Sequence, residues 1–281
     1  MRVLAGIYRF FVYSNIFIAI CAVLMVNQTY SFLLHLSPHS NFIFFVFFST
    51  ICSYSFHWYL TSHSIIPSSR IEWLKYNRYL HIIFFFIGLI GAAIFFFYLL
   101  FYWPWLLFSA VITFLYSAPK IPDKYFRLLR KVAIGKTILL ALVWTYVTTI
   151  LPIIISPLPW QNHFILFIVS RFFLIYAICI LFDYRDREDD KAAGIRSMIT
   201  YLNERAIFYL FIFSLIIFAA ITMWMLKYGY KITDIIILLV PGIIAAFLYK
   251  YAIRNFSDTF YYFILDGLMA LSAILMLIPG I

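Results

Sequence analysis

The sequence predicts an all-α polytopic membrane protein, built as a single transmembrane domain over residues 1–281. Hydrophobic residues make up 65% of the chain and charged residues only 11%, whereas about a quarter of the residues in a soluble protein are charged. The mean hydropathy is +0.99. Apolar runs of roughly 20 residues, the length that crosses a hydrocarbon core of about 30 Å as a helix, follow one another through almost the whole chain. We therefore expect a bundle of nine transmembrane helices.

The nine expected helices can be laid end to end along the sequence. The first follows Arg2 and Arg9 and resembles a signal peptide, but it is long and no small-residue cleavage site follows it. We therefore expect it to be a retained helix. In order along the chain, the expected helices cover residues 10–26, 41–60, 79–101, 103–117, 134–156, 163–182, 206–226, 233–249 and 259–278.

The distribution of basic residues predicts the orientation of these helices. Lys and Arg concentrate in short cytoplasmic loops of membrane proteins. With the N-terminus in the cytoplasm, all but three of the 21 Lys and Arg residues fall on that side; Lys227 and Lys231 fall outside and Arg171 lies within a helix. We expect a multi-pass protein of a bacterial inner membrane. The net charge of +10 then reflects topology and gives no indication of nucleic-acid binding.

Acidic residues gather in one loop, between the sixth and seventh expected helices, where five of the eleven lie between positions 183 and 190. If the sixth helix continues into this loop, 100° per residue places Asp183, Asp186 and Asp190 within an arc of about 60°. Glu188 and Asp189 then point to the solvated side. Three converging carboxylates repel one another unless a cation lies between them. Mg²⁺ suits such a position, because it binds one or two carboxylates together with water and substrate phosphates.

Two interpretations of this acidic loop remain open. It could bind a metal ion that bridges to phosphate, or it could be a surface charge run balanced by nearby bases. The loop after the fourth expected helix, "YSAPKIPDKYFRLLRKVAIGK", carries six bases and one acid on the same side of the membrane. A metal held by carboxylates beside a basic rim suits a polyanion such as diphosphate, since the rim neutralises its outer oxygens.

The two loops together resemble the UbiA superfamily of intramembrane prenyltransferases. Asp183, Asp186 and Asp190 match its second Asp-rich motif, of the form DxxDxxxD, which lies in the cytoplasmic loop after helix six. The segment "YSAPK", which ends at Lys120, resembles the family's Tyr-Ser-x-Pro segment and its diphosphate-binding base. The likeness extends more loosely over most of the chain. Further matching positions after the motif are Gly194, Ile195, Arg196 and Ser197.

The resemblance implies a UbiA-type bundle of nine helices around a central cavity, which opens to the cytoplasmic face and laterally to lipid. It implies an Mg²⁺ cofactor, a prenyl diphosphate substrate and a lipophilic or aromatic acceptor. Asp183, Asp186 and Asp190 would hold the metal and act in catalysis. The residues expected to bind substrate are Arg70, Tyr116, Lys120, Lys191, Arg196 and His57.

The sequence departs from the family at the first Asp-rich motif, which active members carry at the end of helix two. The corresponding segment, "YSFHWYLTSHSIIPSSRIEW", contains no Asp. Tyr54, His57 and Thr61 repeat the spacing of the missing carboxylates, but a phenol, an imidazole and a hydroxyl are poor ligands for Mg²⁺. A second hypothesis is therefore a UbiA-fold protein that has lost catalysis and binds or moves an isoprenoid or lipid. Retention of the second motif favours the enzyme.

Two charges, Arg171 and Asp266, lie within expected helices. An ionised side chain in such a position costs about 3 kcal/mol on the mildest insertion scale. At 1.5 Å per residue, Arg171 lies about 18 Å and Asp266 about 12 Å from the cytoplasmic ends of their helices. We therefore expect the sixth and ninth helices to be neighbours and the two charges to pair, directly or through water.

Overall fold

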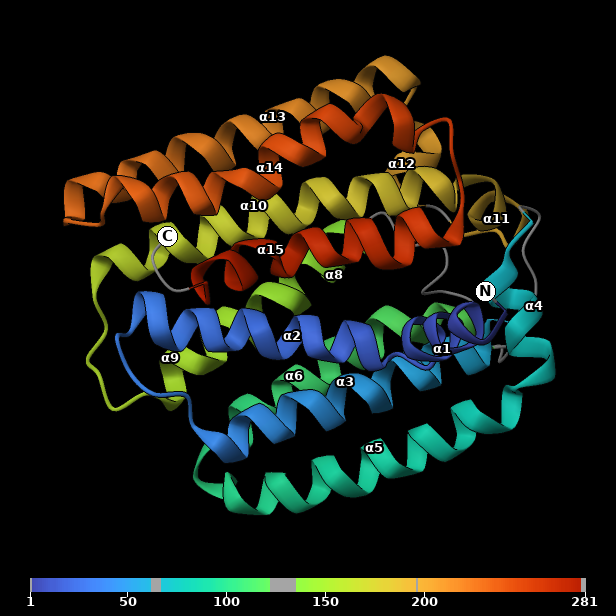
Figure 1. The fold of residues 1–281 in the computed structure, drawn as a ribbon, viewed down its shortest axis with the longest axis horizontal. Helices are drawn as coiled ribbons and strands as arrows, with labels where there is room; N and C mark the ends of the chain where they lie inside the picture. The colour runs from blue at the N-terminus through green and yellow to red at the C-terminus, as the bar shows by residue number, and fades with distance from the viewer. Residues whose placement is uncertain (1, 62–66, 122–134, 196, 279–281) are drawn as a thin grey trace.

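The structure is a computed structural model that describes residues 2–61, 67–121, 135–195 and 197–278. All regular secondary structure in these ranges is helical, and the long helices lie side by side in one bundle (Figure 1). The elements in chain order are α1 (Arg2–Tyr13), α2 (Ile16–Gln28), η1 (Thr29–Leu33), α3 (Ser40–Leu60), α4 (Ser69–Tyr76), α5 (Arg78–Tyr98), η2 (Leu100–Tyr102), α6 (Trp103–Ser117), η3 (Ala118–Lys120), α8 (Lys136–Thr145), η6 (Tyr146–Ile150), α9 (Leu151–Ile155), α10 (Asn162–Arg185), α11 (Arg187–Ala192), α12 (Met198–Tyr201), α13 (Glu204–Trp224), η7 (Met225–Tyr228), α14 (Ile232–Ala252), η8 (Phe260–Leu265) and α15 (Asp266–Met276).

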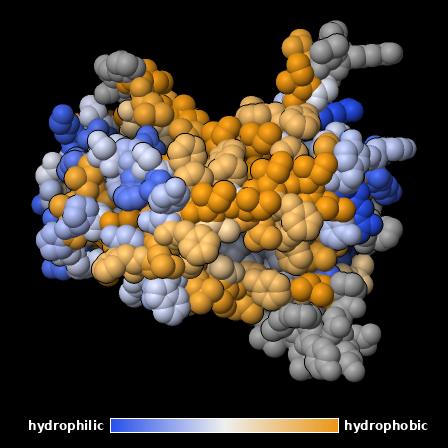
Figure 2. All heavy atoms as spheres, turned by 90° about the horizontal axis from the view of Figure 1, so that it is seen from below, coloured by the Kyte–Doolittle hydropathy of each residue, from blue (hydrophilic) through white to orange (hydrophobic). Residues whose placement is uncertain are grey.

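The predicted all-α polytopic fold is confirmed. Among the described residues, eight helical segments are long and apolar enough to cross a membrane, and a further apolar helix, Phe260–Met276, is shorter. Figure 2 views the side on which α5 lies and shows hydrophobic side chains in a broad band, with hydrophilic side chains gathered toward both ends. The protein is therefore an integral, multi-pass membrane protein. The eight longer segments are Ile16–Leu33, Ser40–Leu60, Arg78–Tyr98, Leu100–Lys120, Lys136–Ile155, Asn162–Arg185, Glu204–Tyr228 and Ile232–Ala252.

The first helix does not have the predicted boundaries. Residues 10–26 were expected to form one helix, but α1 ends at Tyr13 and α2 begins at Ile16 and continues through η1 to Leu33. The chain turns at Asn15, whose φ is 72°, a left-handed conformation that Asn tolerates better than most residues. The Asn15 side chain is fully buried and donates a hydrogen bond to Ser55 Oγ at 3.3 Å. The prediction failed because apolar residues continue on both sides of this polar break.

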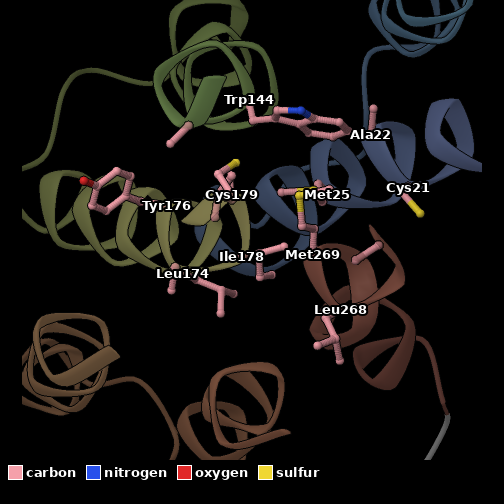
Figure 3. Close-up of a cluster of buried hydrophobic side chains, with 14 of the residues drawn as sticks. Cys21, Ala22, Met25, Trp144, Leu174, Tyr176, Ile178, Cys179, Leu268 and Met269 are labelled. Carbon is pink, nitrogen blue, oxygen red and sulfur yellow. The ribbon is translucent and has the colours of Figure 1, made fainter. Parts of the chain in front are cut away.

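Helix α10 lies at the centre of the bundle. It packs against α8 and α13, and it also contacts α14 and α15. Figure 3 shows side chains of α2, α8, α10 and α15 meeting in one cluster, in which Cys179 and Ile178 of α10 lie near Trp144, Met25 and Met269. The sixth and ninth expected helices correspond to α10 and α15, so the prediction that they are neighbours is confirmed.

Helices α3 and α5 pack closely, because two glycines let their backbones approach. A Cβ atom at Gly88 would lie 2.6 Å from the backbone nitrogen of Cys52 and 2.8 Å from the carbonyl oxygen of Phe48. A Cβ atom at Gly91 would overlap the ring of Phe48. Small residues at such contacts are a common means of helix association in membranes, where apolar side chains gain little by leaving lipid.

The predicted pairing of Arg171 with Asp266 is wrong. Both residues lie in the described part of the chain, and no ion pair joins them there. The Arg171 guanidinium lies instead where η1 and η6 widen two helices into π turns, and neutral oxygens satisfy it. Its donors reach Met25 O at 3.0 Å, Thr29 Oγ1 at 2.7 Å, Thr148 O at 3.1 Å, Thr149 Oγ1 at 3.1 Å and Gln28 Oε1 at 2.5 Å.

Candidate functional site

A cavity of about 1000 Å³ is enclosed mainly by α3, α5, α6, α8 and α10. Its charged lining residues lie at one end, where α8 begins at Lys136 and α10 ends beyond Asp183. Its other end is apolar and is lined by Phe97, Leu106 and Val147. A cavity of this size and polarity suits a molecule with a charged head and a long apolar body.

The acidic motif lies at the charged end of the cavity. Two of its members, Asp183 and Asp190, lie close together there, as their helical spacing predicts. Helix α10 ends at Arg185, and α11 resumes after the single residue Asp186. The nearly continuous helix brings Asp183 and Asp190 to one cation, the ammonium of Lys136. Its Nζ lies 3.4 Å from Asp183 Oδ1 and 2.9 Å from Asp190 Oδ2. Asp186 lines the same cavity.

Two residues that begin α8 complete this cluster. Lys136 contacts both carboxylates, and Thr137 donates a hydrogen bond to Asp183 Oδ2. The positive end of the α8 helix dipole also favours anions here. Burial raises the pKa of Asp190 and that of Asp186, against the opposing effect of the nearby Lys136 charge. Sequence analysis treated Lys136 only as one base among many, because its partners lie far away along the chain.

Arg70, on α4, also lines the cavity. Its guanidinium stacks on Trp58, 3.8 Å from the ring centroid, and on Tyr262 at 4.5 Å. Nη2 donates a hydrogen bond to Asn15 Oδ1 at 2.5 Å. Burial lowers the pKa of Arg70. The side chain is thus held against two aromatic rings.

Asp258 fixes the position of α4 beside the cavity. Its carboxylate accepts hydrogen bonds from the Arg70 backbone N–H at 2.8 Å and from Ser69 Oγ at 2.9 Å. It also accepts one from Ser68 Oγ at 3.1 Å and forms a buried ion pair with Arg185. Sequence analysis missed Asp258, because the contact joins segments almost two hundred residues apart.

Three more predicted substrate-binding residues line the cavity: His57, Tyr116 and Lys120. The Lys120 ammonium donates to Thr61 Oγ1 at 2.7 Å. His57 Nδ1 shares a hydrogen bond of 3.1 Å with Ser117 Oγ, and its ring stacks on that of Tyr116 with 5.3 Å between centroids. The structure therefore brings these three residues to the cavity that also holds Arg70.

The remaining two predicted substrate-binding residues are placed differently. Lys191 is exposed and pairs with Glu188 at 2.7 Å, away from the cavity lining. Arg196 lies outside the described residues. So do four bases of the loop after α6, namely Lys124, Arg127, Arg130 and Lys131.

The fit of this site to Mg²⁺ depends on its oxygen donors. Within the described ranges, no three His, Cys, Asp or Glu side chains converge on one metal position. Two carboxylates, Asp183 and Asp190, do converge on a single cation, and Asp186 lies in the same cavity. Mg²⁺ needs only one or two carboxylates when substrate phosphates supply other ligands. The donor set therefore fits one hard divalent ion that also binds phosphate.

Asp266 is a further carboxylate on the cavity wall. It begins α15, directly after the π-helical η8, and only 8% of its surface is exposed. Its electrostatic neighbours are Arg70 and Arg185, so its carboxyl group lies on the side of the cavity that they line.

Comparison with known proteins agrees with this arrangement. A search of curated proteins and a search of solved structures gave no match. The model of the UbiA prenyltransferase family matches residues 61–265. These residues include the acidic motif, Arg70, Lys120 and Lys136, and the match covers well over half of the chain. The protein therefore belongs to the UbiA prenyltransferase family.

Proposed function

We propose that this protein, as a single domain of residues 1–281, is an intramembrane prenyltransferase that transfers an isoprenoid group from a prenyl diphosphate to a lipophilic or aromatic acceptor. Family membership supports a prenyltransferase-type function. The observation that carries the proposal is the polarity of the cavity: acidic and basic side chains at one end, and an apolar wall at the other. A prenyl diphosphate has the same division.

The charged end would bind the diphosphate. Asp183, Asp186 and Asp190 would hold Mg²⁺, which would supply positive charge to stabilise the diphosphate. Arg70 and Lys120 would neutralise other diphosphate oxygens. His57, hydrogen-bonded to Ser117, and Tyr116, stacked on His57, would line the same pocket. Arg196 and the exposed Lys191 remain candidate contacts for the outer oxygens. The positive-inside distribution supports a cytoplasmic position for this end and for the N-terminus.

The side chains at the charged end are arranged to favour departure of the diphosphate. When the carbon–oxygen bond breaks, the electron pair goes to the diphosphate, whose charge increases. Arg70, held against the rings of Trp58 and Tyr262, needs no reorganisation to stabilise that charge. The allylic carbon then forms its bond to the acceptor, which releases a proton. Aromatic rings on the cavity wall favour the transient cation and exclude water.

The test uses the full chain in lipid nanodiscs with Mg²⁺ and labelled prenyl diphosphates of several lengths. We expect the native chain to bind them and to release diphosphate when an acceptor is present. Asp186→Asn should release at least tenfold less diphosphate, because one of the carboxylates proposed to hold Mg²⁺ is lost. Glu188→Gln, which changes an exposed carboxylate in the same segment, is the matched control. A native chain that neither binds nor cleaves any of these substrates would refute the proposal.

One observation favours a second function, a protein that binds or moves an isoprenoid or lipid without catalysis. The residues that repeat the spacing of the first Asp-rich motif, Tyr54, His57 and Thr61, all make hydrogen bonds to other side chains: Tyr54 accepts one from Trp144, His57 pairs with Ser117, and Thr61 accepts one from Lys120. None of these three side chains is a carboxylate that could bind a second metal ion. Tight binding of prenyl diphosphate without release, in the presence of many acceptors, would support this second function.

A further inference from the structure

We propose that Lys136 is a tethered cation that neutralises Asp183 and Asp190 until a diphosphate arrives, so that a divalent ion binds tightly only together with the anion. This inference rests on the proposed function, since it assigns Lys136 as a further binding residue of the same site. It follows from the contacts that Lys136 makes and from what a metal ion at the same carboxylates would require.

The two carboxylates are already fully partnered. Lys136 Nζ lies 2.9 Å and 3.2 Å from the two oxygens of Asp190 and 3.4 Å from Oδ1 of Asp183. The remaining oxygen, Asp183 Oδ2, accepts a hydrogen bond from Thr137. The side chains are only 12% exposed for Lys136, 5% for Asp183 and 7% for Asp190. The ammonium is therefore their principal counter-charge, and water screens the interaction little.

A metal ion and the Lys136 ammonium cannot use these oxygens at the same time. Mg²⁺ binds carboxylate oxygens at about 2.0–2.1 Å, and two cations on the same pair of carboxylates would repel strongly in a buried site. The ammonium must therefore withdraw when a metal ion binds. Withdrawal without a new partner would leave a buried positive charge unpaired, which is costly.

A diphosphate provides that new partner. Lys136 is the first residue of α8 and lines the cavity together with Lys120 and Arg70. Its flexible stem can move the ammonium toward a phosphate oxygen while Thr137, on the helix backbone beside it, continues to hold Asp183. The diphosphate draws the ammonium away from the carboxylates that the metal ion needs, and the metal ion frees the ammonium to bind the diphosphate. The two ligands therefore bind cooperatively, and the coupling is reciprocal.

The test measures metal binding directly. Mn²⁺ replaces Mg²⁺ and is detected by electron paramagnetic resonance on the purified full chain, with free Mn²⁺ held constant and inorganic pyrophosphate as the anion. We expect pyrophosphate to raise the Mn²⁺ affinity of the native chain at least tenfold. Lys136→Met should bind Mn²⁺ at least tenfold more tightly than the native chain without pyrophosphate, and pyrophosphate should raise its affinity much less.

Two further variants make the test decisive. Lys250→Met removes an exposed lysine at the end of α14 and should behave as the native chain does. Lys136→Arg keeps a cation at the site. In the absence of pyrophosphate, this variant should bind Mn²⁺ as weakly as the native chain does. If Lys136→Met does not fold, an Arg variant that binds Mn²⁺ tightly without pyrophosphate overturns the proposal. So does a native chain with equal Mn²⁺ affinity in both conditions.

The failure of this inference differs from the failure of the proposed function. A chain that transfers a prenyl group but binds Mn²⁺ equally with and without pyrophosphate overturns the role of Lys136 alone. A chain in which pyrophosphate and Mn²⁺ bind cooperatively, with the predicted response to Lys136→Met, supports that role. If the same chain releases no diphosphate from any prenyl substrate, it refutes the transferase and supports the non-catalytic binding protein.

Discussion

Asp258 illustrates how single residues hold the candidate site in place. It is 5% exposed, pairs with Arg185 and caps the start of α4 through Ser69 and the Arg70 backbone. Asp258→Asn leaves the buried Arg185 charge unpaired, so we expect a loss of about 3–5 kcal/mol in unfolding free energy. Thermal unfolding in detergent measures it. Glu188→Gln, which breaks an exposed pair, should leave the melting temperature unchanged; equal effects would contradict the assignment.

The carboxylate of Asp186 is expected to lower stability at neutral pH. Burial raises the pKa of Asp186 in the folded state above its value in the unfolded state. The group therefore contributes its full stabilisation only below the unfolded-state pKa, and this contribution is lost as the pH rises through the folded-state pKa. At pH 7 the ionised group therefore costs free energy, and Asp186→Asn should raise the melting temperature in EDTA. The gain should shrink as the pH is lowered toward 4. A gain that does not depend on pH would show that ionisation is not its cause.

Sequence analysis found some site residues and missed others for a physical reason. Asp183, Asp186 and Asp190 share one short segment, whose helical spacing is visible in the sequence. Lys136 and Asp258 act through contacts between distant segments, which no local pattern records. Their importance could be recognised only when the cavity was known.

Helices α3 and α5 provide a test at the scale of elements. Alanine at Gly88 would place a methyl group 2.6 Å from the backbone of α3, where neither helix can move aside without losing contacts. We expect Gly88→Ala to destabilise the protein by about 1–3 kcal/mol, measured by thermal unfolding. Gly6→Ala is the control, because no atom lies within 4 Å of the added methyl group. A Gly88 variant as stable as the native chain would show that the two helices can separate freely.

The elements whose prediction was wrong share one property: polar groups inside apolar segments form hydrogen bonds to partners that are distant in the sequence. Hydropathy alone continued the first helix through Asn15, whose side chain is bonded to Ser55 and Arg70. The same approach gave Arg171 an acidic partner, whereas the π turns of η1 and η6 offer carbonyl and hydroxyl oxygens instead. Apolar composition predicts where helices lie, but it does not predict where they break or widen.

The orientation of the whole molecule can be tested with two new cysteines. Lys227 and Arg254 are both exposed and lie at opposite ends of α14. If the N-terminus is cytoplasmic, an impermeant maleimide added to intact cells should label Lys227→Cys, whereas Arg254→Cys should react only after permeabilisation. The native chain is the control, because Cys21 and Cys179 are buried and Cys52 is partly buried. The reverse labelling pattern would invert the topology.

Much of the whole-molecule architecture was predictable because the bilayer limits the choices. A chain with this hydropathy must pair its backbone groups within helices, and the required length sets their number. The cavity was not predictable in the same way. Its volume and lining depend on side chains of many helices, which meet only in the folded bundle.

The exposed residues of the cavity wall bear on the phase from which a substrate would enter the protein. Leu89 and Phe97 of α5 and Leu107 of α6 line the cavity and are each more than two-fifths exposed on the apolar surface. An isoprenoid that enters between these helices comes from the bilayer and never dissolves in the aqueous phase. Saturation would then follow the mole fraction of the isoprenoid in the lipid. Diluting it with inert phospholipid, at constant bulk concentration, would slow turnover.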